Sequence, residues 1–236
     1  MPRNPLHVLA GRPLIEWVWR RAKGFATLDA VVVATDSEEV AEVCRAAGAV
    51  VELTSPDHAS GTDRVAEVAD REAYREFDVV VNIQGDEPFV AEEQVAAAAS
   101  LVQEGWDVGT VATPVRTLEA WRDPAVVKVV RRDDGGALYF SRAPIPFLRD
   151  GDPTPEALGS HRFLRHLGIY AYSRSALGRW VALPPGELER IERLEQLRAL
   201  AAGLSIGVAT VESAEGGVDT YDDARRAEAR LLAAAR

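Results

Sequence analysis

Cysteine and lysine are scarce in this chain, whose 236 residues include one cysteine, Cys44, and two lysines, Lys23 and Lys128. A single cysteine excludes a disulfide framework. Cys44 occupies an apolar position of a helical pattern, so we expect a buried thiol rather than a reactive one. Arginine supplies all the other basic residues, and in a chain this biased most individual arginines carry little functional information.

The sequence also lacks long hydrophobic runs and an excess of positive charge. No run approaches the ~18 apolar residues that a membrane-spanning helix needs, and the first residues lead into no apolar signal-peptide core. The formal net charge is -10, which excludes a broad basic surface for duplex nucleic acid. We therefore expect a cytoplasmic protein that binds no nucleic acid and spans no membrane. Because no internal repeat or clear linker is present, we expect residues 1–236 to form a single domain.

Strand and helix patterns alternate in the first third of the chain. Residues 29–35, 49–53 and 78–84 are short apolar runs typical of buried strands. Helices are expected between them, over 37–47 and about 63–72. This alternation predicts a parallel sheet with helices on both faces.

The later part of the chain has a different pattern. Three segments alternate apolar and polar residues, which favours antiparallel or mixed pairing at one side of the sheet: residues 108–115, 126–132 and 164–173. The same alternation places Lys128 on a solvated strand face. Apolar residues then recur at helical spacing over 187–203, and a strand over 205–211 precedes a terminal helix from about residue 221.

Polar residues that directly follow buried strands are the first candidates for a site, because ligands bind at the carboxyl ends of strands in open α/β sheets. Asp86 follows one such strand and could ligate a divalent cation, although capping the next helix explains it equally well. Asp219 follows two glycines and, taken alone, is better explained as a turn residue. The two acids could, however, meet across the sheet and hold one Mg²⁺.

Other segments carry polar chemistry of their own. Residues 58–64 (HASGTDR) combine hydroxyls with a helix N-terminus, which suits an anion or a nucleobase edge; a capped surface loop is the alternative. Arginines in 140–144 and 165–170 could bind a carboxylate, while His166 alone would more often be structural. Glu195 and Gln196 would by themselves belong to an exposed helical face.

Six segments together resemble the 3-deoxy-manno-octulosonate cytidylyltransferase family and cover nearly the whole chain. They are HASGTDR (58–64), NIQGDEP (82–88), ALYFSRAPIPF (137–147), FLRHLGIYAYSR (163–174), LERIERLEQLRAL (188–200) and GVDTYDD (217–223). The resemblance implies a nucleotide-diphospho-sugar-transferase fold, which is a Rossmann-like α/β mixed sheet with helices on both faces, and a cytoplasmic homodimer. It also implies a Mg²⁺-dependent reaction in which CTP and 3-deoxy-D-manno-octulosonate (Kdo) give CMP-Kdo and pyrophosphate, for lipopolysaccharide biosynthesis.

The resemblance assigns roles to individual residues. It implies that Asp86 and Asp219 are catalytic and bind Mg²⁺. It places five residues near the nucleotide: Arg3, Ser60, Gly61, Thr62 and Gln84. It places six around the sugar acid: Arg64, Arg142, His166, Tyr170, Glu195 and Gln196. The implied reaction is attack of the anomeric hydroxyl of Kdo on the α-phosphorus of CTP, which needs positioning and charge stabilisation rather than a protein nucleophile.

The first residues depart from the family pattern. In the family, a buried strand leads into a basic loop of the form A-R-x-x-S-T-R-L-P-G-K-P-L, and only the end of that loop is present here, in residues 1–6. Asn4 occupies the lysine position, and the neighbouring Arg3 could substitute in part. We therefore expect that the N-terminal strand is missing from this chain and that the native protein begins upstream of Met1.

Two alternatives to the Kdo reaction stay open at this point. A cytidylyltransferase for the related sugar acid 8-amino-Kdo has motifs that cannot be separated from these, whereas a sialic acid fits them less well. A degenerate sugar-binding homologue without the triphosphate loop would bind Kdo without turning over CTP.

Overall fold

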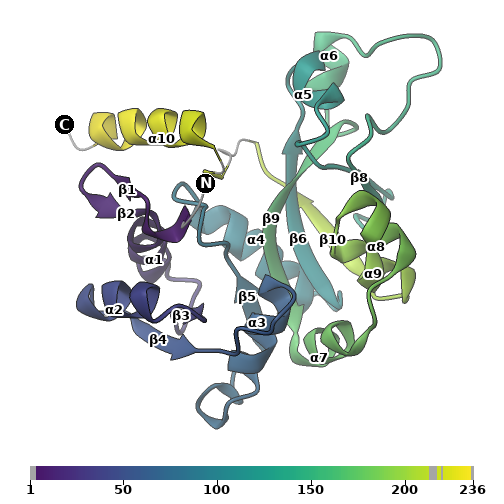
Figure 1. Cartoon of the computed structure of the whole chain (residues 1–236). Coiled ribbons are helices and arrows are strands. Elements are labelled where there is room, and N and C mark those ends of the chain that lie inside the picture. The colour runs from purple at the N-terminus through teal and green to yellow at the C-terminus, as the bar shows by residue number, and fades with distance from the viewer. Residues whose placement is uncertain (1–3, 213–216, 219, 235–236) are drawn as a thin grey trace. The chain divides into compact units, whose positions relative to one another are not determined.

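The computed structural model describes residues 4–212, 217–218 and 220–234, and its elements are labelled in Figure 1. The chain divides into two compact units. Unit 1 comprises Met1–Arg75, Ile83–Glu92 and Glu215–Arg236, and unit 2 comprises Glu76–Asn82 and Glu93–Ala214. The prediction of a single domain over residues 1–236 stays a prediction. None of the helices in the described part of the chain is long and apolar enough to cross a membrane.

Unit 1 combines two small sheets with helices from both ends of the sequence. Its elements are η1 (Asn4–Leu6), β1 (Val8–Leu9), β2 (Arg12–Pro13), α1 (Leu14–Lys23), β3 (Val32–Thr35), α2 (Glu38–Ala46), β4 (Val50–Leu53), α3 (Gly61–Ala69), η2 (Glu72–Tyr74) and α10 (Tyr221–Ala234). Strands β1 and β2 pair antiparallel, and β3 and β4 pair parallel. The helices predicted over 37–47 and 63–72 are confirmed as α2 and α3, with shifted ends.

Helices α1 and α2 share an apolar cluster with the β3–β4 sheet. Trp19, Val33, Val40 and Cys44 are its buried members. The Ser37 hydroxyl accepts a hydrogen bond from the Val40 N–H at 3.3 Å, which caps the start of α2. The prediction of a buried thiol is confirmed, and burial raises the pKa of Cys44 to about 11.

The β1–β2 hairpin turns at two residues with left-handed backbone, Ala10 (φ 46°) and Gly11 (φ 81°). Left-handed backbone is strained for alanine and easy for glycine. The turn is held from two helices, because Glu228 of α10 accepts the Ala10 N–H at 2.9 Å and the Trp17 indole of α1 donates to the Leu9 carbonyl at 2.8 Å. The N-terminal hairpin and the C-terminal helix therefore fold as one structure.

Unit 2 is built around a six-stranded mixed sheet. Its elements are β5 (Val79–Asn82), α4 (Glu92–Gln103, whose first residue belongs to unit 1), β6 (Val108–Pro114), α5 (Leu118–Arg122), β7 (Lys128–Arg131), β8 (Ala137–Ser141), α6 (Pro155–Leu158), β9 (Leu164–Ser173), α7 (Arg174–Ala182), α8 (Glu187–Glu192), α9 (Gln196–Ala201) and β10 (Ile206–Thr210). The strands follow the order β10, β6, β9, β7, β8, and β5 also pairs with β9. Figure 1 shows α4 on one side of this sheet and α8 and α9 on the other.

The strand pairing confirms a mixed sheet but changes the partner of one strand. Strand β10 pairs parallel with β6, and the remaining pairs in unit 2 are antiparallel. Residues 78–84 were expected to join the strands at 29–35 and 49–53 in a parallel sheet. In the described part of the chain β5 instead pairs antiparallel with β9, where Asn82 lies opposite Tyr170.

The single helix predicted over 187–203 is wrong, because the chain breaks there into α8 and α9. Arg193 adopts left-handed backbone (φ 53°), which ends α8 and changes the chain direction before α9. The apolar stripe divides in the same way. Ile191 of α8 is 71% exposed, whereas Leu197 of α9 is 1% exposed. Helical periodicity cannot reveal such a break, because the apolar spacing continues through it.

The prediction that Lys128 lies on a solvated strand face is also wrong. Lys128 is fully buried, and its Nζ donates to the carbonyls of Asp123 (2.8 Å), Val126 (2.5 Å) and Arg142 (2.7 Å). Burial lowers the pKa of the ammonium.

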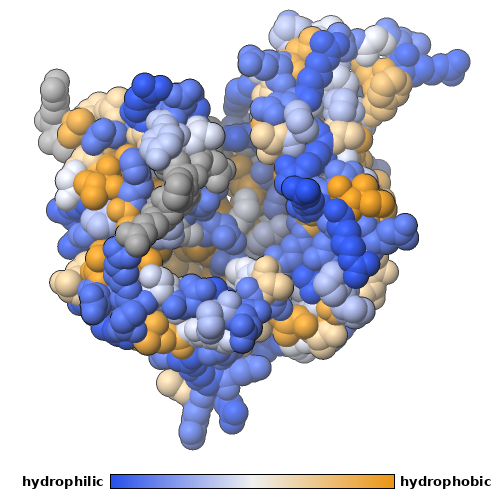
Figure 2. Space-filling view, in the orientation of Figure 1, coloured by the Kyte–Doolittle hydropathy of each residue, from blue (hydrophilic) through white to orange (hydrophobic). Residues whose placement is uncertain are grey.

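The visible face of the molecule is mainly hydrophilic, with apolar residues in several separate groups (Figure 2).

Candidate functional site

The structure divides the predicted site residues between the two units. Unit 1 carries Ser60, Gly61, Thr62, Arg64, Gln84 and Asp86, and unit 2 carries Arg142, His166, Tyr170, Glu195 and Gln196. Arg3 and Asp219 lie outside the described residues. The described residues assigned to the nucleotide all lie in unit 1. Those assigned to the sugar acid lie in unit 2, except Arg64, which lies in unit 1.

Asp86 lies in a tight turn that follows β5 in the sequence. The turn closes with a hydrogen bond from the Glu87 N–H to the Gln84 carbonyl at 3.2 Å, and Asp86 is half-buried. The Asp86 carbonyl accepts the N–H of Val218, the residue before Asp219, at 2.9 Å. The segment before Asp219 therefore lies beside the Asp86 turn in unit 1, while the meeting of the two acids stays a prediction.

Close packing explains why residue 217 is a glycine, and the sequence did not reveal this reason. A Cβ at this position would lie 3.1 Å from the Glu87 Oε1 and 3.4 Å from the Asp86 carbonyl oxygen. Glycine therefore permits the close approach between the 217–218 segment and the Asp86 turn. The described residues contain no group of three or more histidine, cysteine or acidic side chains that could hold a metal ion, so the two-acid site stays a prediction.

Residues 58–64 form the loop and first turn of α3. The Ser60 hydroxyl accepts the Asp63 N–H at 3.2 Å and donates to the Asp63 carboxylate at 2.8 Å, so it caps the helix. Thr62 is buried, whereas Gly61 is exposed. The first N–H groups of a helix have no partner within it, and at Gly61 this end is accessible to an anion.

Arg64 joins the carboxyl ends of two parallel strands. Its guanidinium lies 3.1 Å from the Asp36 carboxylate, directly after β3, and it donates to the hydroxyl of Thr54, directly after β4. Both contacts hold Arg64 at the edge where strand-end ligands bind in an α/β sheet.

A network of charged side chains joins residues 55–58 to α3, and the sequence analysis did not find it. The Glu67 carboxylate of α3 accepts the Ser55 N–H at 2.9 Å, and its Oε2 lies 2.6 Å from the His58 Nε2. Arg71 donates to the other oxygen of Glu67 at 2.7 Å and also binds Glu52. These contacts tie residues 55–58 to α3 and thereby position the start of the Ser60 loop. The signal in the sequence was an acid seven residues after Ser60, which periodicity alone assigns to a solvated face.

We expect Glu67→Gln to weaken the fold at neutral pH and to reduce its acid sensitivity. The backbone bond from Ser55, followed by His58 and Arg71, lowers the pKa of Glu67 from 4.5 to about 2. A lowered folded-state pKa stabilises the fold above the unfolded value and loses that contribution as the pH falls from about 4.5 toward 2. Urea unfolding at several pH values should show a smaller loss of stability on acidification in the variant than in the unmodified chain.

The control for this experiment is Glu72→Gln, which changes an exposed acid in the neighbouring η2. It should leave the pH dependence of unfolding unchanged. A Glu67→Gln profile parallel to that of the unmodified chain would show that Glu67 carries no such coupling.

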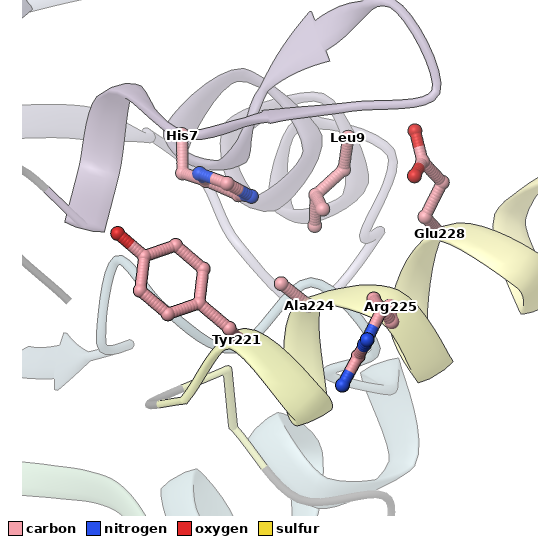
Figure 3. A pocket seen from close by; sticks show the side chains of 6 residues that line it. All are labelled: His7, Leu9, Tyr221, Ala224, Arg225 and Glu228. Carbon is pink, nitrogen blue, oxygen red and sulfur yellow. The ribbon is translucent and has the colours of Figure 1, made fainter.

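An open pocket of about 320 Å³ lies between the N-terminal segment and α10 in unit 1. Figure 3 shows His7 and Leu9 on one side, with Tyr221, Ala224, Arg225 and Glu228 of α10 on the other. The His7 and Tyr221 rings meet edge to face at 6.1 Å. Glu228 binds the Ala10 N–H and Arg225 pairs with Asp222, so both charged lining groups already have partners.

The sugar-acid candidates of unit 2 gather at an irregularity in β9. Val111 of β6 pairs with Leu167 and Thr110 pairs with Tyr170, which leaves two residues of β9 without an opposite residue. Residues four apart in a regular strand are ~13 Å apart. Here the rings of His166 and Tyr170 are 5.3 Å apart, because the bulge shortens the strand between them.

Both bulge side chains are uncharged near neutral pH. His166 keeps part of its surface exposed, yet burial among packed side chains lowers its pKa to about 3. Burial, followed by the nearby Tyr172 and Glu195, raises the pKa of Tyr170 well above its usual value. Gln196, the first residue of α9, is 4% exposed.

Arg142 is held at the break between α8 and α9. Its Nε donates to the Glu192 carbonyl at 2.7 Å, Nη1 to the Pro124 carbonyl at 2.9 Å and Nη2 to the Arg193 carbonyl at 3.4 Å. The Glu192 carboxylate in turn accepts the Arg142 N–H at 2.9 Å and the Ser141 hydroxyl at 2.6 Å. Glu192, which the sequence did not single out, therefore fixes Arg142 and the junction that leads into Glu195.

Comparison with known proteins identifies the family of this chain. The family model described as "Cytidylyltransferase" matches residues 1–206. A 3-deoxy-manno-octulosonate cytidylyltransferase of Gemmatimonas aurantiaca is 52% identical over 228 residues, which cover 96% of this chain and 87% of that protein. Another protein of that name, from Xanthomonas campestris pv. campestris (strain 8004), is 46% identical over 242 residues, covering 99% and 95%.

A solved structure, CMP:2-keto-3-deoxy-manno-octonic acid synthetase complexed with CTP, is 36% identical to this chain. Its TM-score is 0.88, and the match covers 99% of this chain and 93% of that one. The chain therefore belongs to the cytidylyltransferase family, among the 3-deoxy-manno-octulosonate cytidylyltransferases. The resemblance and the nucleotide-diphospho-sugar-transferase fold inferred from the six segments are confirmed.

Proposed function

We propose that this chain transfers CMP from CTP to Kdo and releases pyrophosphate. The observation that carries the proposal is its 52% identity, over 96% of its length, to a protein named 3-deoxy-manno-octulosonate cytidylyltransferase. The anomeric oxygen of Kdo forms a bond to the α-phosphorus of CTP, the bond from that phosphorus to the pyrophosphate oxygen breaks, and the hydroxyl proton is lost. Such a transfer depends on positioning and electrostatic stabilisation rather than on a covalent enzyme intermediate.

On the nucleotide side, the residues of unit 1 supply hydrogen bonds and positive charge. The exposed start of α3 at Gly61 offers backbone N–H groups to an anionic or carbonyl oxygen. Arg64, which the resemblance assigns to the sugar acid, lies in the same unit and supplies a fixed guanidinium at the strand ends, held between Asp36 and Thr54. Gln84 begins the turn that presents Asp86.

We propose that Asp86 and Asp219 hold a Mg²⁺ ion during turnover. The bond from the Val218 N–H to the Asp86 carbonyl supports this pair, because it places the residue before Asp219 against the Asp86 turn. Carboxylate oxygens are the ligands that Mg²⁺ prefers. The ion would offset negative charge on the reacting phosphates.

On the sugar side, the residues of unit 2 offer a mixture of donors and acceptors. Tyr170 stays protonated and donates a hydrogen bond, while Glu195 accepts one. Three guanidinium N–H groups of Arg142 already bind backbone carbonyls, so two remain for the sugar carboxylate. Gln196 completes the set as an amide.

We further propose a cytoplasmic homodimer whose product is the activated sugar for lipopolysaccharide. Exposed apolar side chains of unit 2 offer surface that a second copy of the chain would bury. Phe147 is 80% exposed and Ile191 is 71% exposed; the others are Leu138, Leu148 and Leu188.

The proposal is tested by measuring pyrophosphate release. We expect release only when CTP, Kdo and Mg²⁺ are all present, with little release when UTP replaces CTP. A faster reaction with 8-amino-Kdo would identify that sugar acid as the substrate. Binding of Kdo by folded protein without pyrophosphate release would instead show a binding protein.

A further inference from the structure

The hydroxyl of Thr110 has three polar neighbours in the bulge of β9. Thr110 is fully buried in β6. Its Oγ1 lies 2.7 Å from the Ile169 carbonyl oxygen, 3.4 Å from the Leu167 carbonyl oxygen and 2.8 Å from the Nε2 of His166. Ile169 lies in the bulge and has no opposite residue in β6, and the hydroxyl contacts its carbonyl.

The Thr110 hydroxyl carries one proton for these three contacts, and the contacts show which neighbour receives it. A carbonyl oxygen only accepts, so the short contact to Ile169 requires Thr110 to donate there. The Thr110 oxygen must then accept in its contact with His166. His166 therefore carries its proton on Nε2, and in a neutral ring Nδ1 is left as an acceptor.

The surroundings of the ring agree with this neutral form. Phe140 meets the imidazole edge to face at 5.0 Å and the Tyr170 ring lies at 5.3 Å. In the described part of the chain no carboxylate pairs with the ring, so nothing there favours the imidazolium. Among the described residues, Nδ1 has no hydrogen-bond partner, and His166 as a residue is partly exposed. Nδ1 is therefore the ring atom that is left to accept a hydrogen bond.

We propose that Thr110 is a positioning residue that fixes the tautomer of His166, so that Nδ1 accepts a hydrogen bond from a hydroxyl group of the sugar acid. This inference rests on the proposed function, because it assumes that His166 contacts the sugar. A carboxylate has no proton to give at neutral pH and is repelled by the Nδ1 lone pair. His166 thus selects for a hydroxyl, and the carboxylate is left to Arg142.

The tautomer can be measured without any substrate. A two-bond ¹⁵N–¹H correlation spectrum distinguishes the protonated nitrogen of a neutral imidazole from the unprotonated one. The chain has four histidines, and the signals lost in His166→Gln identify the ring in question. We expect a protonated Nε2 and an unprotonated Nδ1, and the opposite pattern would overturn the proposal.

The functional consequence is tested with Thr110→Val, which keeps the shape and removes the hydroxyl. We expect its KM for Kdo to rise about tenfold, because the hydrogen bond from the sugar hydroxyl to His166 Nδ1 is lost. Its KM for CTP should change less than about twofold, because His166 is not assigned to the nucleotide. Thr110→Ser keeps the hydroxyl and should restore both values. Thr113→Val is the matched control, because Thr113 is buried on the same strand and its hydroxyl has no partner among the described residues.

The outcomes separate this inference from the proposed function. An unchanged KM for Kdo in Thr110→Val, or an equal rise in Thr113→Val, would overturn the role of Thr110. If Thr110→Val does not fold, the serine variant and the spectrum of the unmodified chain still decide the assignment. If the unmodified chain does not consume Kdo, the proposed function fails and the sugar contact fails with it, whereas the measured tautomer shows whether the structural assignment was correct.

Discussion

Replacing Asp86 by asparagine should lower the rate of pyrophosphate release from CTP and Kdo by about a thousandfold, because in the proposed metal site the variant loses a negative charge that would hold the Mg²⁺ ion. Asparagine has nearly the same shape as aspartate. Its side chain can still occupy the turn, so the expected loss comes from charge rather than from packing.

The position of Asp86 in the fold makes this expectation specific. The turn from Gln84 to Glu87 is closed by its own backbone bond, and the Asp86 carbonyl is held by Val218. These backbone contacts do not involve the carboxylate, so Asp86→Asn should leave them intact. Unfolding by urea should therefore give nearly the same midpoint for the variant and the unmodified chain.

The measurement is the steady-state rate as a function of Mg²⁺ concentration. Asp29→Asn is the control, because Asp29 is an exposed acid of the same unit and should be replaceable without loss. An Asp86→Asn variant with the rate and Mg²⁺ dependence of the unmodified chain would remove Asp86 from the metal site. Asp219→Asn should give a similar loss if the two acids share one ion.

Replacing Lys128 by methionine should lower the free energy of unfolding by about 3 kcal/mol, more than any other substitution discussed, because buried carbonyls lose their hydrogen-bond donor. The ammonium binds three carbonyls, from Asp123, Val126 and Arg142. Methionine fills similar space but donates no hydrogen bond. The gain from no longer burying a charge offsets part of the loss, which keeps the expected effect well below three full hydrogen-bond penalties.

A second consequence concerns Arg142. Its carbonyl binds Lys128, and its guanidinium binds the Pro124 carbonyl in the loop that Lys128 also holds. Loosening this loop should raise the KM for Kdo as well as lower stability. Urea unfolding and steady-state kinetics on the same preparation measure both effects.

The chain offers a matched control in its other lysine. Lys23 is exposed on α1 and lies 5.0 Å from the centre of the Trp19 ring. Lys23→Met should cost less than about 1 kcal/mol, the range of an exposed cation–π contact. Equal effects from the two substitutions would contradict a structural role for the buried ammonium.

Much of the secondary structure follows from local sequence signals. Helix α2 begins after a serine cap and its apolar positions repeat at helical spacing, so both its existence and its buried Cys44 were predicted. The segments that form β6, β7 and β9 were expected to pair in antiparallel or mixed fashion, and β9 does pair antiparallel with both β6 and β7, while β6 also pairs parallel with β10. These features depend on neighbouring residues, which is why the sequence reveals them.

The candidate site could be predicted only in part. Asp86 and Asp219 were considered as a pair that could meet, and the bond from the Val218 N–H to the Asp86 carbonyl places the residue before Asp219 beside the Asp86 turn. Thr110 and Glu192 were not found, because each acts through groups far away in the sequence, and Glu67 was not found because helical periodicity assigns it to a solvated face. Thr110 contacts His166 across a bulge, and Glu192 binds Arg142 from 50 residues away.

The sequence by itself determined the family, the succession of strands and helices, and the residue types available for binding a nucleotide and a sugar acid. Tertiary structure alone decided that β5 pairs with β9, that the chain breaks at Arg193, and that Lys128 is buried. The physical reason is that hydrophobic periodicity reports what one segment prefers. Strand partners, bulges and buried polar contacts are instead chosen by the free energy of the whole packed unit, in which distant backbone groups compete for the same donors.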